Sequence, residues 1–96
     1  MTLLQRVKAN RLEILDAAKR HKVANPRLFG SVAKGLETPD SDIDILVDAL
    51  PGTTLFDLGG LQEELQTLLK TRVDVVTAKG LKMSLRQQIL SEAVGL

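Results

Sequence analysis

The 96-residue sequence carries 13 Lys and Arg residues against 12 Asp and Glu residues, and this near-neutral charge argues against a nucleic acid as the primary partner. Its 44% hydrophobic and 26% charged residues exclude a disordered or fibrous protein and fit one globular domain spanning residues 1–96. Cysteine is absent, which excludes disulfides and cysteine-ligated zinc, and no segment approaches the roughly 20 apolar residues of a membrane span, so we expect a soluble, cytoplasmic protein without membrane contact.

The first part of the chain predicts a helix followed by a strand. Apolar residues recur at helical spacing from Leu3 to about Arg20, with basic residues between them, which predicts one amphipathic helix. The pair Asn25-Pro26 disfavours continued helix. The run RLFGS that follows is apolar up to its glycine, and it therefore predicts a strand that ends near Phe29.

The rest of the chain predicts two more strands and two more helices. The runs DIDILV and RVDVVT are typical of buried strands. A helix between them should begin at Thr54, which can form a capping box with Asp57. A last helix, extending to Val94, should begin with a second capping box, Ser84 and Gln87. This order predicts an α/β (α+β) domain with a small mixed sheet covered by helices on one side.

Two carboxylates face the same way in the second predicted strand. Asp42 and Asp44 are two residues apart, so both project from one face while Ile43 and Ile45 project from the other. Aspartate is disfavoured in strands and like charges repel, so the arrangement is unfavourable unless a cation binds between them. The plainer alternative, that both carboxylates simply solvate the strand end, fits this short motif as well.

A third carboxylate, Asp74, repeats this pattern in the third predicted strand, between Val73 and Val75. If the two strands are neighbours, about 4.8 Å apart, the three carboxylates can gather on one face of the sheet. Such hard oxygen ligands select Mg²⁺, or alternatively Mn²⁺, over zinc. Each Asp taken singly remains compatible with an ordinary strand end.

The run FGSVAKG has the composition of a phosphate-binding loop. Gly30 after a strand lets the backbone approach a phosphate, and Ser31 can cap a following helical turn and offer its hydroxyl. Lys34 supplies a point positive charge, and Gly35 can close the turn in a left-handed conformation. Taken singly, the Gly-Ser pair could be an ordinary tight turn and Lys34 a solvated surface residue. The chain has two aromatic residues, so a nucleotide should be held by its phosphates more than by its base.

Combined as GSVAKGLETPDSDID and, after a helix, VDVV, these motifs resemble the minimal nucleotidyltransferase family of the polymerase β superfamily. The similarity runs from about Arg27 to the end of the chain and includes LFDLGGLQEEL and RVDVVTAKGLK. Members often act as the antitoxin of two-gene modules whose toxin is a helical HEPN-type ribonuclease. The chain departs from the family pattern at Lys34, where many relatives carry Arg, and at Leu36, where they carry an acidic residue that this chain has at Glu37.

The resemblance implies a polymerase β-like nucleotidyltransferase core and a role for each motif. Asp42 and Asp44 would hold one Mg²⁺ on the triphosphate and would share a second ion with Asp74, the candidate general base. These three residues are thus the implied catalytic and metal-binding set. The implied nucleotide-binding residues are Gly30, Ser31, Lys34 and Ser41. His21, the one histidine, lies among basic residues at a helix end and is given no catalytic role.

Three functions remain open under this resemblance. The first is a protein adenylyltransferase that moves AMP from ATP to a hydroxyl of a HEPN-type toxin and acts as its antitoxin, in a homo- or hetero-oligomer. The second is a small-molecule enzyme of the aminoglycoside-modifying type, although such enzymes usually carry an added helical domain. The third is a non-catalytic module that neutralises a toxin by contact, against which the retention of three mutually repelling carboxylates argues.

Overall fold

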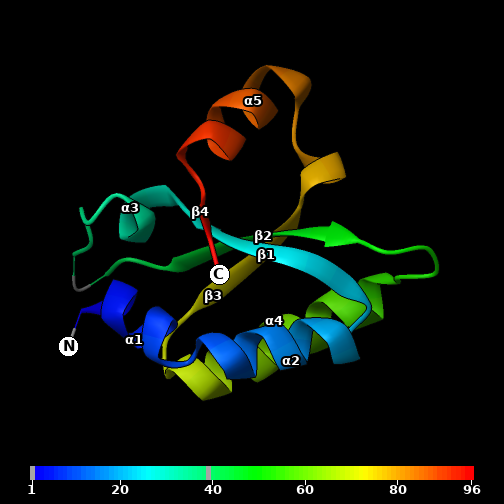
Figure 1. Cartoon of the computed structure of the whole chain (residues 1–96), viewed down its shortest axis with the longest axis horizontal. Helices are drawn as coiled ribbons and strands as arrows, with labels where there is room; N and C mark the ends of the chain where they lie inside the picture. Colours follow the sequence, from blue (N-terminus) through cyan, green and yellow to red (C-terminus); the bar gives the residue numbers. More distant parts are fainter. Residues whose placement is uncertain (1, 39) are drawn as a thin grey trace.

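A four-stranded mixed sheet forms the centre of the computed structural model, which describes residues 2–38 and 40–96 (Figure 1). Its strands are β1 (Val23–Phe29), β2 (Ile43–Ala49), β3 (Val73–Thr77) and β4 (Val94–Gly95), in the order β3-β2-β1-β4. Strand β1 is antiparallel to both of its neighbours, whereas β2 and β3 are parallel. The mixed sheet predicted from the sequence is therefore confirmed.

The hydrophobic core lies between one face of the sheet and the helices α2 (Arg11–Arg20) and α4 (Leu55–Leu69) (Figure 1). In β2, the side chains that enter this core alternate with side chains on the opposite face, as the period of a strand requires. The core members from β2 are Ile43, Ile45 and Val47. Among the described residues, no helix is long and apolar enough to cross a membrane.

The opposite face of the sheet is covered differently. The helix α5 (Met83–Glu92) follows the 3₁₀ turn η1 (Ala78–Gly80) and lies on the side of the sheet away from α2 and α4 (Figure 1). It buries none of its side chains. Leu46 of β2 is fully buried but does not belong to the main core. The prediction that helices cover one side of the sheet is confirmed by α2 and α4, and α5 lies on the other side without burying a side chain.

The predicted first helix is in fact two helices, α1 (Leu3–Ala9) and α2, which meet at Asn10. Asn10 leaves the helical conformation, with φ −104° and ψ 20°. Its side-chain Nδ2 donates to the carbonyl oxygen of Arg6 at 2.8 Å, where its own backbone N–H also donates at 3.2 Å. An Asn side chain that competes for backbone carbonyls in this way interrupts a helix, although the apolar spacing continues through it.

The two capping-box predictions have opposite outcomes. Thr54 caps α4 and forms the reciprocal pair with Asp57, as predicted. The capping box at Ser84 is wrong, because the N-cap of α5 lies two residues earlier, at Lys82, which makes no side-chain cap. The carbonyl of Lys82 accepts the first hydrogen bonds of the helix, from the N–H groups of Leu85 and Arg86, both at 2.9 Å.

The predicted end of the last helix is also wrong. Helix α5 ends at Glu92, and Ala93 is extended, with φ −70° and ψ 145°. Val94 then pairs with Leu28 of β1, as part of the short strand β4. Strand β4 satisfies backbone groups along the edge of β1 that would otherwise remain open, and this long-range pairing outweighs the local preference for helix.

Candidate active site

Three segments that are distant in the sequence meet at one level of the sheet. Asp44 of β2 is the register partner of Asp74 in the parallel strand β3 and of Phe29 in the antiparallel strand β1. Gly30 follows Phe29 directly, and a Cβ atom on Gly30 would collide with Oδ2 of Asp44. The Asp44 carboxylate therefore lies against the bare backbone of Gly30, beside the strand that carries Asp74.

The electrostatic surroundings of Asp44 are unfavourable for its charge. Partial burial raises the pKa of Asp44 above its ordinary value, and the neighbouring charges of Asp74 and then Asp42 raise it further. Asp74 itself is exposed to solvent, so its carboxylate is accessible from outside the sheet. Asp44 thus lies close enough to Asp74 and to Asp42 for their charges to act on its own.

Asp42, which directly precedes β2, has a cationic neighbour that the sequence reading missed. Nε of Arg72 lies 3.8 Å from Oδ1 of Asp42. Arg72 is 85% exposed, so water screens this ion pair strongly. The contact follows from the register of the two strands: Ile43 pairs with Val73 in the parallel ladder, which places the residues that precede them side by side, and the sequence alone does not give this register.

The glycine-serine turn is held close to the segment that carries the aspartates. Gly30 opens the short helix α3 (Gly30–Ala33) with φ +78°, a conformation that favours glycine. The hydroxyl of Ser31 donates to Oγ of Ser41 at 3.5 Å, so these two predicted nucleotide-binding residues lie together. The prediction that Ser31 caps a helical turn is wrong, because Phe29 is the N-cap of α3 and makes no side-chain cap.

Lys34 and Gly35 follow α3. Gly35 has φ +71°, which confirms the predicted left-handed turn. The ammonium group of Lys34 forms an ion pair with Glu92, the last residue of α5, and not with an aspartate: Nζ lies 3.1 Å from Oε2 of Glu92. The sequence did not indicate this pairing, because it joins two segments almost 60 residues apart.

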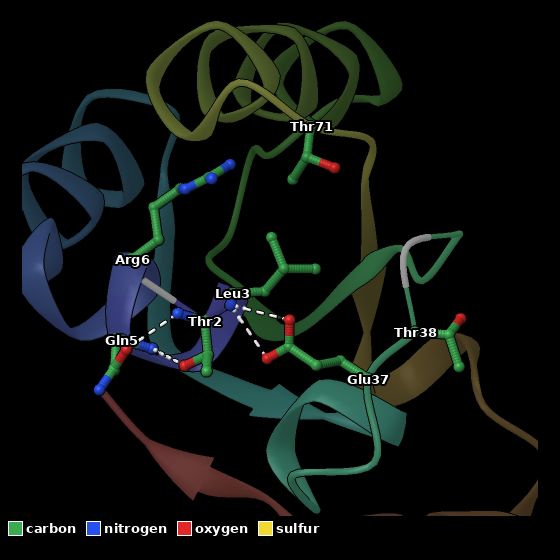
Figure 2. A pocket seen from close by; sticks show the side chains of 7 residues that line it. All are labelled: Thr2, Leu3, Gln5, Arg6, Glu37, Thr38 and Thr71. Atoms are coloured by element: carbon green, nitrogen blue, oxygen red, sulfur yellow. Dashed lines mark hydrogen bonds between the residues drawn. The ribbon is translucent and has the colours of Figure 1, made fainter.

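Glu37 has a structural role that its sequence position did not reveal. Its carboxylate accepts from the backbone N–H of Leu3 at 2.9 Å and from that of Leu4 at 3.4 Å, and so caps α1 (Figure 2). Arg6 donates to the carbonyl oxygen of Leu69 at 2.9 Å. These contacts border a cavity of about 620 Å³ between α1, the Glu37–Thr38 segment and Thr71 (Figure 2). Because its lining includes none of the three aspartates, we place the chemistry elsewhere, at the aspartates themselves.

The donor chemistry of the aspartate cluster suits a hard divalent cation. Carboxylate oxygens are the ligands that Mg²⁺ and Mn²⁺ prefer. A cation beside Asp44 would also relieve the repulsion that raises its pKa. In the part of the chain that the structure describes, no three His, Cys, Asp or Glu side chains are already arranged to hold a metal ion together.

Comparisons of the sequence and of the structure with known proteins both find nucleotidyltransferases. The family model of the nucleotidyltransferase domain matches residues 12–96. The protein adenylyltransferase MntA of Thermococcus cleftensis is 38% identical over 79 residues, which cover 82% of this chain and 80% of that protein. The residues matched by the family model include Asp42, Asp44 and Asp74 of this chain and its Gly30-Ser31 turn.

Solved structures are similar over most of the chain. A protein provisionally named a minimal nucleotidyltransferase is 43% identical, has a TM-score of 0.91, and is matched over 100% of this chain and 97% of its own. A toxin–antitoxin structure with AMP-PNP has a TM-score of 0.76 at 27% identity, over 90% of this chain and 71% of the matched chain.

Proposed function

The chain belongs to the nucleotidyltransferase-domain family and is therefore an enzyme of that class, and on this premise we propose that it transfers AMP from ATP to a hydroxyl group of a partner protein. The relative from Thermococcus cleftensis is named a protein adenylyltransferase, and the toxin–antitoxin structure that resembles this chain contains AMP-PNP. Both support ATP as the nucleotide and a protein as the acceptor. We further propose that the acceptor is a HEPN-type toxin in the cytoplasm, for which this chain is the antitoxin.

One observation carries the proposal: Asp44, Asp74 and Gly30 lie at the same level of three adjacent segments. A nucleotidyl transfer needs a carboxylate group that binds metal, an accessible base and a place where a phosphate can approach the backbone. Asp44 is half-buried, Asp74 is exposed, and Gly30 has no side chain to block the approach. The arrangement supplies all three features within one small region.

We assign Asp42 and Asp44 as the residues that would hold Mg²⁺ on the triphosphate, with Asp74 sharing a second ion with them. Bound Mg²⁺ or Mn²⁺ would neutralise the departing pyrophosphate and make the acceptor hydroxyl more acidic. The repulsion of Asp44 by Asp74 and Asp42 supports this assignment, because a cation bound between them would relieve it.

The chemical step assigns a role to each predicted residue. The acceptor oxygen forms a bond to the α-phosphorus, the bond from that phosphorus to the bridging oxygen breaks, and pyrophosphate leaves. The proton of the acceptor hydroxyl passes to the carboxylate of Asp74, which solvent can reach. The triphosphate would lie along Gly30 and Ser31, with Ser41 beside them and Lys34 supplying positive charge. The protein contributes mainly by placing charges.

We expect Asp42→Asn to lower AMP transfer at least about a hundredfold, because it removes a metal ligand, while leaving the fold intact. The test is transfer of label from α-phosphate-labelled ATP, with Mg²⁺, into an extract of the host cell. A labelled protein band that is absent with Asp42→Asn supports the proposal, provided that circular dichroism shows a folded variant.

Other outcomes of the same experiment contradict the proposal. Label confined to small molecules would indicate an enzyme of the antibiotic-modifying type. An absence of transfer with ATP and with the other nucleoside triphosphates would indicate a module that acts by binding alone. Full transfer by Asp42→Asn would remove Asp42 from the proposed metal site.

A further inference from the structure

The ion pair between Lys34 and Glu92 joins the glycine-serine turn to the end of α5. The two side chains are about half exposed, at 46% and 42%, and lie 3.1 Å apart. Lys34 is the C-cap of α3, and its backbone N–H donates to the carbonyl oxygen of Gly30 at 3.3 Å. The position of Lys34 is therefore fixed relative to the turn, while its long side chain can change partner.

Glu92 stands where a negative charge does not help its own helix. The carboxyl end of a helix carries partial negative charge, so an acidic side chain there is unfavourable by itself. Helix α5 has no basic residue in its last turn to compensate, and Lys34, from another element, provides the compensating charge. The charge of Glu92 is therefore stabilised by Lys34 and not by its own helix.

We propose that Glu92 occupies Lys34 in the nucleotide-free protein and that a bound triphosphate takes its place. This inference rests on the proposed function in one respect, that the triphosphate lies on the Gly30–Ser31 turn. A carboxylate and a phosphate present similar anionic oxygens to an ammonium group, so the two compete for Lys34. Glu92 is then a positioning residue that lowers nucleotide affinity without touching the nucleotide, and nucleotide binding frees the end of α5.

The direct test is calorimetric binding of AMP-PNP with Mg²⁺, and of inorganic tripolyphosphate, to the wild-type chain and to Glu92→Gln. We expect Glu92→Gln to bind both probes about two- to fivefold more tightly, the range expected for loss of an exposed ion pair. The gain should shrink as salt is added. Glu63→Gln, at an exposed position of α4, is the control for the change in net charge and should bind as the wild type does.

The background variant Lys34→Gln separates competition from a general charge effect. Without Lys34, Glu92→Gln should no longer tighten binding. The inference is overturned if Glu92→Gln binds equally or more weakly, if its gain persists in the Lys34→Gln background, or if neither probe binds the wild-type chain. Tighter binding by Glu92→Gln without any AMP transfer would contradict the proposed function alone, whereas normal transfer with unchanged affinity would contradict this inference alone.

Discussion

Asp44 shows at the scale of one residue how a functional site can oppose stability. Its carboxylate is half-buried against Gly30 and next to Asp74, and these surroundings raise its pKa. Asp57 shows the opposite case: it accepts from the backbone N–H of Thr54 at 2.9 Å, and this hydrogen bond lowers its pKa. One carboxylate is placed where its charge is unfavourable for folding, and the other is placed where it is favourable.

The sign of each shift fixes a pH dependence that Asp44→Asn should reveal. A folded-state pKa raised above the ordinary 3.8 means that the folded protein binds the proton more tightly than the unfolded chain. The free energy of unfolding therefore falls as the pH rises through the interval between the ordinary pKa of 3.8 and the raised pKa of folded Asp44. We expect Asp44→Asn to be more stable than the wild type at pH 7 in urea unfolding, and the difference to disappear as the pH falls below that interval.

Asp57→Asn provides the control of opposite sign. The pKa of Asp57 is lowered, so its contribution is present above the ordinary value of 3.8 and is lost as the pH falls through the lowered value. This variant should be less stable than the wild type at neutral pH. A stability of Asp44→Asn below that of the wild type at pH 7 would contradict the account of Asp44.

The aspartates could be predicted from the sequence, but the two glutamates that hold neighbouring segments of the site region could not. The DIDILV and VDVV runs pointed to Asp42, Asp44 and Asp74. Strand alternation applies to Asp44 and Asp74, whereas the prediction that Asp42 belongs to the strand is wrong, because β2 begins at Ile43. Glu92 and Glu37 carry no comparable local signal. Their contacts, with Lys34 and with the start of α1, arise only when distant parts of the chain meet.

At the scale of the element, α4 contains two adjacent glycines that weaken the helix equally but lie in different surroundings. Gly60 lies against the ring of His21, and a Cβ atom there would be 3.1 Å from Cε1, whereas Gly59 faces open space. Nε2 of His21 contacts Glu64 one turn further along α4 at 3.2 Å. Glu64 also accepts from Arg20 at 2.7 Å, which lowers the pKa of Glu64 to about 2. Gly60 thus lets α4 approach the end of α2 where these contacts form.

The two glycines make a matched pair for a stability experiment. Gly59→Ala should raise the free energy of unfolding by about 0.5–1 kcal/mol, the usual gain for replacing glycine within a helix. Gly60→Ala should gain less, because the His21 ring has to move by a few tenths of an ångström. Urea unfolding measures both values, and in a His21→Ala background they should become equal. Equal gains with His21 present would contradict the close contact.

Local sequence patterns predicted the start of α4 but missed the break at Asn10 and the end of α5. The capping box of Thr54 is a short-range interaction and was recognised, while the interruption at Asn10 depends on which carbonyl an Asn side chain reaches. The end of α5 could not be found locally, because Ala93 and Val94 are compatible with helix. Their extended conformation is fixed by pairing with β1.

At the scale of the whole molecule, the fold separates stability from chemistry. The helices α2 and α4 cover one face of the sheet, and α5, which buries none of its side chains, lies on the other side (Figure 1). Asp44 alternates in β2 with the core residues Ile43 and Ile45, so its side chain lies on the face away from the main core. The chemical face can therefore open to an acceptor without disturbing the main core. The parallel pairing of β2 with β3 is what brings Asp44 to Asp74. Strand spacing predicted this meeting only on the assumption that the strands are neighbours.

The central claim is that this face transfers AMP to a hydroxyl of a partner protein. The most direct test is peptide mapping by mass spectrometry of the partner after incubation with ATP and Mg²⁺, using the wild-type chain, Asp44→Asn and Asp16→Asn, which changes an exposed aspartate of α2. We predict AMP on a Ser, Thr or Tyr hydroxyl with the wild-type chain and with Asp16→Asn, and none with Asp44→Asn. Modification by Asp44→Asn at the wild-type level, or an unmodified partner that the wild-type chain nevertheless binds, would contradict the claim.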